Sequence, residues 1–155
     1  MGKKWLDIVY NEKSSIKLKQ HYKSWANDYD QDLIDWGYAY PSQLKKILSQ
    51  DIKLKKSSKI LDAGCGTGLV AEVLGDMNFK NIVGLDYSLD MLKIAKDKKI
   101  YTRLIQESLN KKTSLRSNQF DVVLCTGVLT SGHVGAKAIN ELIRVTKNKG
   151  YLILS

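Results

Sequence analysis

The 155-residue chain is poor in the residues that build disulfide frameworks and proline-rich linkers, with two cysteines and one proline. Cys65 and Cys125 cannot form a disulfide framework, and no histidine or cysteine spacing typical of a metal site surrounds them. No uncharged apolar run approaches the roughly 18 to 20 residues of a membrane span, and no signal-peptide core is present near the first residue. We therefore expect a cytoplasmic protein with free thiols, no metal and no membrane contact.

Arginine is also scarce, although the net charge is +9. Most of the 25 basic residues are lysines, which fall in short pairs over nearly every segment. The chain lacks the basic stripe with interleaved aromatic residues that is typical of nucleic-acid binding. A lysine-rich solvated surface explains this pattern, and an RNA-modifying activity is supported by the net charge alone.

Short apolar runs and helix-like stretches alternate from Lys59 onward, in a chain whose length fits one domain. We predict buried strands at 60–61, 82–85, 101–105, 120–125 and 151–154, and helices around 44–48 and at 69–77, 89–98 and 136–146. This alternation is typical of a doubly wound, parallel α/β sheet. The polar stretch 110–118 predicts a loop or a short helix.

A segment rich in aromatic residues precedes this pattern. We predict that residues 1–57 form a helical lead-in and lid, and that residues 58–155 form the ligand-binding core. Tyr22, Trp25 and Tyr29 follow helical spacing, which predicts an aromatic stripe on one face of a short helix. Such a stripe fits either plain packing or a lid over a ligand.

The strongest functional signal lies between the first predicted strand and the helix that follows it. Gly64, Gly66 and Gly68 alternate there, two residues after Asp62 and just before Leu69. Glycines at the end of a strand permit a tight turn and let a ligand approach bare backbone, while the helix start offers unpaired N–H groups. Ligands of open α/β sheets bind at the carboxyl ends of the strands, where this loop falls. The alternative is a tight turn that connects the strand to the helix and binds no ligand.

A dinucleotide site is the main competing interpretation of this loop. Its G-x-G-x-x-G fingerprint would require a third glycine where this chain has Leu69. Asp62 would repel a pyrophosphate, whereas the ammonium and sulfonium of S-adenosylmethionine would be attracted. No Gly-Lys-Ser or Gly-Lys-Thr follows the glycines, which excludes a phosphate loop. Spacing and charge both favour S-adenosylmethionine.

An acidic residue, Asp86, ends the second predicted strand about 20 residues after the glycine loop, where its carboxylate can accept both ribose hydroxyls. Tyr87 would lie beside the adenosine and could cover the adenine, and Ser88 is expected to cap the next helix. Met91 belongs to the same candidate set, although its helical position is more typical of core packing.

These two segments, 61–68 and 84–88, resemble motif I and the following motif of class I S-adenosylmethionine-dependent methyltransferases. Further segments, at 22–30, 35–38, 120–123, 127–128 and 132–135, are most similar to the Williams-Beuren-region methyltransferase-like proteins. The resemblance implies a Rossmann-like sheet in the order 3-2-1-4-5, with the family's strands 6 and 7 missing. We expect a shortened form or a fragment, whose exposed fifth strand would allow a dimer.

The resemblance also implies which residues hold the cofactor. The adenine contact after the third strand falls on Ser108, with the Leu109 backbone as a substitute, and Tyr29 could bind the methionine carboxylate. The candidate cofactor-binding residues are Tyr29, Asp62, Gly64, Cys65, Gly66, Gly68, Asp86, Tyr87, Met91, Ser108, Leu109 and Cys125. His133 is the candidate general base, although a lone histidine in a glycine-rich loop is more often exposed.

The sequence thus predicts a methyltransferase that uses S-adenosylmethionine, releases S-adenosylhomocysteine and acts on an unknown small-molecule or protein acceptor. The alternative is an S-adenosylmethionine-binding module without independent catalytic activity. The alternative is motivated by the shortened sheet and by Ser108, which stands where the family usually has an aspartate.

Overall fold

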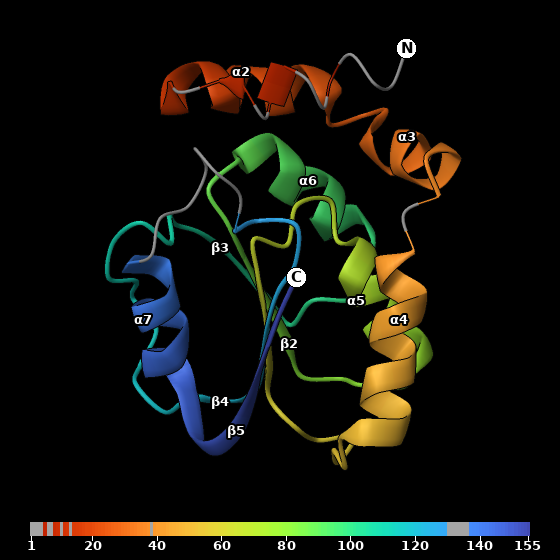
Figure 1. The fold of residues 1–155 in the computed structure, drawn as a ribbon, viewed down its shortest axis with the longest axis vertical. Coiled ribbons are helices and arrows are strands. Elements are labelled where there is room, and N and C mark those ends of the chain that lie inside the picture. The colour runs from red at the N-terminus through yellow and green to blue at the C-terminus, as the bar shows by residue number, and fades with distance from the viewer. Residues whose placement is uncertain (1–4, 6–7, 10, 13, 38, 130–136) are drawn as a thin grey trace.

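A computed structural model describes residues 5, 8–9, 11–12, 14–37, 39–129 and 137–155. Its centre is a parallel five-stranded sheet in the order β3-β2-β1-β4-β5, which confirms the predicted order (Figure 1). The strands are β1 Ile60–Ala63, β2 Ile82–Asp86, β3 Arg103–Gln106, β4 Phe120–Cys125 and β5 Thr146–Leu154. The strand order reverses at β1, because the chain pairs β2 on one side of β1 and β4 on the other.

Helices cover both faces of this sheet. They are α4 Tyr40–Lys46 with the π-helical turn η1 Ile47–Asp51, α5 Leu69–Asp76, α6 Leu89–Asp97 and α7 Lys137–Val145. Figure 1 shows α4 and α5 on one side of the sheet and α7 on the other. Alternate residues of β1 enter two cores, because Ile60 packs with Leu44 and Leu74, whereas Leu61 packs with Leu142.

The edge strands differ most from their predicted bounds. β3 begins two residues later than expected, so Tyr101 lies outside it. β5 begins earlier, directly after α7, and its register is irregular: Thr146 pairs with Phe120, and Tyr151 pairs with Val122. Residues 147–150 therefore leave the regular ladder between these two pairs, which the apolar run 151–154 gave no reason to expect.

Two short helices, α2 Ser15–Trp25 and α3 Tyr29–Asp35, precede α4. The prediction of a single helix carrying Tyr22, Trp25 and Tyr29 was wrong, because residues 26–28 form a turn. Asn27 and Asp28 are typical turn residues, since their short polar side chains compete with helical hydrogen bonding. The rings nevertheless meet, with 4.6 Å between the centroids of Trp25 and Tyr29.

The predicted loop at 110–118 is confirmed, and it is attached to α7 by a buried polar network. The Glu141 carboxylate accepts hydrogen bonds from the Thr113 backbone N–H at 2.8 Å and from its hydroxyl at 2.6 Å. Arg144 donates to the same carboxylate at 2.6 and 2.7 Å and to the Leu115 carbonyl at 2.8 Å. This network holds the loop against α7.

Candidate functional site

The glycine loop turns sharply at the carboxyl end of β1. Gly64, Gly66 and Gly68 all adopt left-handed backbone, with φ of +78°, +51° and +94°. The backbone N–H of Gly64 donates to the carbonyl of Leu85 at 2.7 Å, which fastens the loop to the end of β2. A side chain at Gly64 would collide with Val128 after β4. The loop therefore requires glycine for both conformation and space.

Asp86 joins the two predicted halves of the site. Its Oδ2 accepts the backbone N–H of Gly66 at 2.9 Å, and its Oδ1 accepts the N–H of Ser88 at 2.8 Å. Burial raises the pKa of this carboxyl, which is 8% exposed, and the N–H groups of Ser88 and Gly66 oppose that rise. Each carboxylate oxygen can accept a second hydrogen bond. Asp86 could therefore hold the loop and a ligand hydroxyl at the same time.

Asp62 is a second buried carboxylate at the same edge, and it is only 1% exposed. Asp62 lies opposite Gly84 in the strand register, and Gly84 precedes Asp86 by two residues. Because alternate residues of a strand share a face, both carboxylates occupy one face of the sheet. Burial raises the pKa of Asp62 to about 7, and the charge of Asp86 adds to this rise. Neither carboxylate forms an ion pair with a cation of the described chain.

The hydroxyl of Tyr101 donates to Asp62 Oδ2 at 2.7 Å. Sequence reasoning missed this contact. The available signal was weak: a tyrosine at the start of an apolar run that was itself predicted to be a strand. The structure places Tyr101 before β3 and turns its side chain toward the centre of the sheet, beside Gly84.

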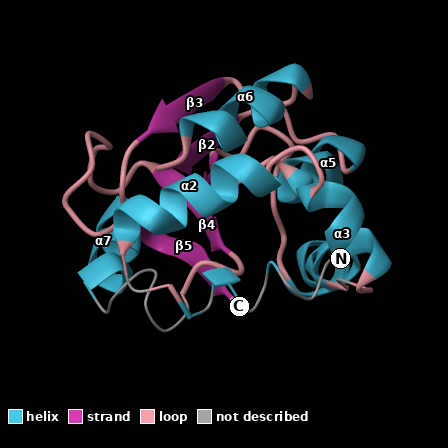
Figure 2. Ribbon diagram, turned by 90° about the horizontal axis from the view of Figure 1, so that it is seen from above, coloured by secondary structure: helices cyan, strands magenta, loops and turns pink. Residues whose placement is uncertain are grey.

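The N-terminal helices lie above this edge. Figures 1 and 2 show α2 crossing over the end of the sheet at which the glycine loop and the end of β2 lie. Tyr22 of α2 contacts Tyr87 edge-on, with 6.4 Å between ring centroids, and Tyr29 of α3 packs against Tyr22 at 6.4 Å. The aromatic stripe thus reaches the candidate site through Tyr87.

Asp30 of α3 connects these helices to the core, and sequence reasoning assigned it no role. Its carboxylate accepts hydrogen bonds from the hydroxyl of Thr67, in the glycine loop, and from the ammonium of Lys98 at 2.7 Å. Lys98 also pairs with Glu72 of α5 at 3.0 Å. The glycine loop is thereby bonded to both the sheet below it and the helices above it.

Ser108, Leu109 and Met91 were also predicted to bind the cofactor. Ser108 and Leu109 follow β3, as expected, but the Ser108 hydroxyl accepts the backbone N–H of Asn110 at 3.2 Å. Leu109 is buried in the core on the α7 side. Met91 is 2% exposed, in agreement with the core packing that its helical position favoured, and Ser88 caps α6 as predicted.

Cys65 and Cys125 are both buried free thiols, as predicted. Burial raises the pKa of Cys125 to about 12 and that of Cys65 well above its ordinary value. Thiols with raised pKa values are poor nucleophiles, so neither residue supports covalent chemistry. His133 lies outside the described residues. Among the described residues, no group of three or more acidic, histidine or cysteine side chains could hold a metal ion.

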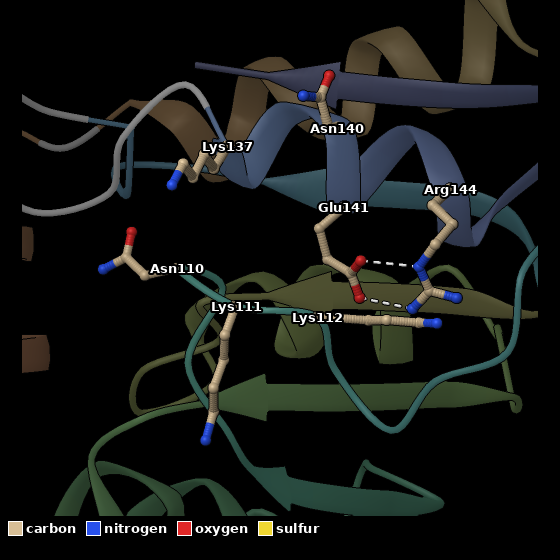
Figure 3. Close-up of a pocket in the computed structure, with 7 residues that line it drawn as sticks. All are labelled: Asn110, Lys111, Lys112, Lys137, Asn140, Glu141 and Arg144. Atoms are coloured by element: carbon tan, nitrogen blue, oxygen red, sulfur yellow. Dashed lines mark hydrogen bonds and ion pairs between the residues drawn. The ribbon is translucent and has the colours of Figure 1, made fainter.

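A separate hollow of about 390 Å³ lies between α7 and the loop after β3 (Figure 3). It is lined by Asn110, Lys111, Lys112, Lys137, Asn140, Glu141 and Arg144, none of which belongs to the predicted site. The three lysine side chains point in different directions, and the Arg144 guanidinium is paired with Glu141. The hollow therefore offers no converging set of donors for one ligand.

No helix of the described chain is long and apolar enough to cross a membrane.

Comparisons with known proteins agree with this geometry. A family model for a methyltransferase domain matches residues 61–154. Human methyltransferase-like protein 27 is 38% identical over 136 residues, an alignment that covers 86% of this chain and 55% of that protein. An uncharacterized protein of Methanocaldococcus jannaschii is 37% identical over 111 residues, covering 70% of this chain and 44% of the other. The chain spans about half the length of these relatives.

Solved structures show the same fold. A protein of Methanococcus maripaludis, named for an expected S-adenosyl-L-methionine-dependent methyltransferase activity, is similar with a TM-score of 0.71 at 21% identity, covering 86% of this chain and 63% of that one. The [4+2]-cyclase SpnF is similar with a TM-score of 0.60 at 24% identity, covering 71% of this chain and 42% of that one. One fold therefore serves more than one chemistry.

Proposed function

The chain belongs to the class I S-adenosylmethionine-dependent methyltransferase family, and from this premise we propose that it binds S-adenosylmethionine between the glycine loop and Asp86. Its reaction is methyl transfer to a small-molecule or protein acceptor, with S-adenosylhomocysteine as the second product. The observation that carries this proposal is the 2.9 Å bond from the Gly66 N–H to Asp86, because it joins bare backbone and a carboxylate into one surface.

The residues present fit this cofactor. Asp86 keeps acceptor capacity for the ribose hydroxyls. Gly64 and Gly66 have no side chain to block a methionine moiety, and because their N–H groups already donate to Leu85 and Asp86, their carbonyls are the backbone groups proposed to face the ligand ammonium. Asp62 and Asp86 form no ion pair among the described residues, and burial raises the pKa of both. A ligand with an ammonium and a sulfonium would favour their ionised forms, whereas a pyrophosphate would be disfavoured beside them. Ser108 and the Leu109 backbone are proposed to face the adenine.

The chemistry of the reaction makes modest demands on the protein. When bound, S-adenosylmethionine supplies a methyl carbon that its sulfonium has already activated. The chain has to orient the acceptor and exclude water. Orientation speeds the reaction because it holds the reacting atoms at the right distance and angle. We assign the exclusion of water to residues 1–57, with Tyr29 and Tyr87 on the cofactor side, and the removal of a proton to His133.

The bond between Asp30 and Thr67 supports a lid role for the N-terminal helices, because it connects α3 directly to the loop that would hold the cofactor. The contact of Tyr22 with Tyr87 adds a second connection, immediately after Asp86. We propose that the lid and the core act in the cytoplasm as one unit.

An Asp86→Asn variant tests the cofactor site. The amide keeps one acceptor oxygen but cannot accept from Gly66, Ser88 and two ribose hydroxyls together. We expect the dissociation constant for S-adenosylmethionine to rise at least 10-fold, since hydrogen bonds to charged groups contribute about 1.5–3 kcal/mol each. Calorimetric titration measures this change, and circular dichroism checks the fold. Asp90→Asn on α6 is the matched control, because that carboxylate bonds only to Lys93 among the described residues. Equal affinity in the Asp86 variant would contradict the assignment.

Transfer of a labelled methyl group to fractionated small molecules and proteins tests the reaction itself. Labelled product with the wild-type chain, and a strong reduction with Asp86→Asn, would support an enzyme. Binding of S-adenosylmethionine without labelled product in any fraction would instead support the alternative of a binding module.

A further inference from the structure

We infer that Tyr101 is a positioning residue for the cofactor: its hydroxyl holds the Asp62 carboxylate beneath the glycine loop and thereby sets the pH range in which a cationic ligand binds. This inference rests on the proposed S-adenosylmethionine site. It concerns a residue that lies outside the two sequence motifs and 39 positions away from Asp62 in the chain.

The ring of Tyr101 occupies a slot that two glycines create. A Cβ at Gly84 would lie 2.8 Å from Tyr101 Cε1 and 2.7 Å from Leu104 Cδ2, so a side chain there would displace the ring. A Cβ at Gly68 would lie 3.1 Å from Cε2 on the other side of the same ring. The ring therefore fits between β2 and the glycine loop, and this packing fixes the direction of its hydroxyl.

The surroundings of Asp62 leave the carboxylate dependent on that hydroxyl. The titratable groups that face it are Tyr101 before β3, Asp86 at the end of β2, Cys65 in the glycine loop and Cys125 at the end of β4. None of these groups is a cation. Within the described chain, the Tyr101 hydroxyl at 2.7 Å is the hydrogen-bond donor to this carboxylate.

The two influences on Asp62 act in opposite directions. Burial raises the pKa of Asp62 to about 7, and the bond from Tyr101 restrains that rise. Near neutral pH a share of the Asp62 carboxyl groups is therefore still protonated in the free protein. A ligand ammonium nearby favours the charged form, even without direct contact, because charges interact strongly in a buried site. Binding then releases the remaining proton to solvent.

The direction of the pH effect follows from this scheme. Affinity for a ligand with an ammonium should rise as the pH increases through about 7, because ionised Asp62 becomes the main species. Tyr101→Phe removes the restraining bond, raises the pKa of Asp62 further and moves the rise in affinity to higher pH. A residue that only packs the core would change affinity by the same factor at every pH.

Calorimetry between pH 6 and 9 with S-adenosylhomocysteine tests this scheme. Each unit by which the pKa rises should weaken binding up to about tenfold at pH 7 and much less at pH 9. 5′-Methylthioadenosine lacks the amino-acid moiety, so its affinity should show no such pH-dependent difference. Tyr151→Phe is the control, because Tyr151 lies exposed on β5. Parallel pH profiles for wild type and Tyr101→Phe would overturn the inference. Failure of the wild-type chain to bind S-adenosylhomocysteine at any pH would instead overturn the proposed function.

Two measurements need no cofactor-dependent activity. Carbon NMR of the Asp62 carboxyl in the ligand-free protein should show a higher titration midpoint in Tyr101→Phe than in wild type, and an unchanged midpoint would overturn the inference. In the wild type, calorimetry in buffers of different ionisation enthalpy should detect release of a fraction of a proton per S-adenosylhomocysteine near pH 7. Release of none would overturn it, even if the variant failed to fold.

Discussion

Asp62 and Glu141 are both buried carboxylates, at 1% and 8% exposure, yet their surroundings shift their pKa values in opposite directions. The Arg144 guanidinium and Thr113 surround Glu141 with donors, and Arg144 above all lowers the pKa of Glu141 to about 2. Among the described residues only the Tyr101 phenol donates to Asp62, and burial raises the pKa of Asp62 to about 7. Glu141 thus has a counter-ion within the chain, whereas Asp62 forms no ion pair in the part of the chain that the structure describes.

We propose that this difference separates a structural role for Glu141 from a ligand-binding role for Asp62. A buried charge with its own counter-ion contributes to folding mainly because breaking the pair would be costly. A buried charge without one destabilises the folded chain when it is ionised, and it can be stabilised by a cation that arrives with a ligand. The contrast predicts that the two sites respond differently to substitution and to pH.

The largest effect on stability should follow from Arg144→Met, which leaves Glu141 buried without its cation. We expect a loss of about 2–3 kcal/mol in the free energy of unfolding, below the value for fully buried pairs because Arg144 is 22% exposed. Urea unfolding at pH 7 measures this loss, with the exposed Arg116→Met as control.

The effect of Arg144→Met on the free energy of unfolding should depend on pH. Because the pKa of Glu141 is depressed, the stability that it contributes is present above about pH 4.5 and is lost as the pH falls toward about 2. The gap between Arg144→Met and wild type should therefore shrink in acid. An Arg144→Met chain as stable as wild type at pH 7 would remove the contrast between the two carboxylates.

An intermediate effect of opposite sign is expected for Asp62→Asn. The raised pKa means that the folded chain holds the Asp62 proton more tightly than the unfolded chain, so stability falls as pH rises from about 4 to about 7. The rise from 3.8 to about 7 would by itself correspond to about 4 kcal/mol. The neutral amide avoids this penalty but buries an NH₂ group, which costs about 1–3 kcal/mol when it lacks an acceptor, so we expect a net gain of about 2 kcal/mol at pH 8 that narrows toward pH 4.

Thermal or urea unfolding of Asp62→Asn at both pH values measures the gain, and the same variant should bind S-adenosylhomocysteine more weakly. A loss of stability at pH 8 would mean that Asp62 supports the fold in the way that Glu141 does. That result would place both carboxylates in one structural class.

The smallest effect should come from Asp30→Asn, which weakens the connection between α3 and the core without touching either buried carboxylate. Lys98 keeps its pair with Glu72, so we expect a loss of about 0.5 kcal/mol in the free energy of unfolding. Hydrogen exchange should become faster in α2 and α3 but not in β1 or β4. Asp35→Asn is the matched control on α3, and equal exchange in the two variants would argue against the lid.

The parts of the candidate site that lie close together in the sequence could be predicted from it. The alternating glycines at 64–68 and the acidic end of the strand at Asp86 carry their chemistry locally, so pattern and spacing located both. The strand order 3-2-1-4-5 was predicted through the family resemblance, and the structure confirmed it.

Contacts between distant side chains could not be predicted in this way. The Asp62–Tyr101 bond spans 39 positions, and the Asp30–Lys98 bond spans 68. Such pairs depend on which side chains the fold brings together, and an aspartate or a tyrosine alone gives no local signal of its partner. The turn at 26–28 was missed for a related reason, because helical spacing of aromatic residues continues across a short break.

We propose that the two buried carboxylates and the glycine loop select an adenosyl ligand that carries an ammonium over one that carries a pyrophosphate. The most direct test is a side-by-side calorimetric titration of the wild-type chain with S-adenosylhomocysteine and NAD at pH 8. We predict that S-adenosylhomocysteine binds and that NAD binds at least about 100-fold more weakly, because its pyrophosphate would face two buried carboxylates; the corresponding difference is about 2.7 kcal/mol. Tighter binding of NAD than of S-adenosylhomocysteine would overturn this proposal.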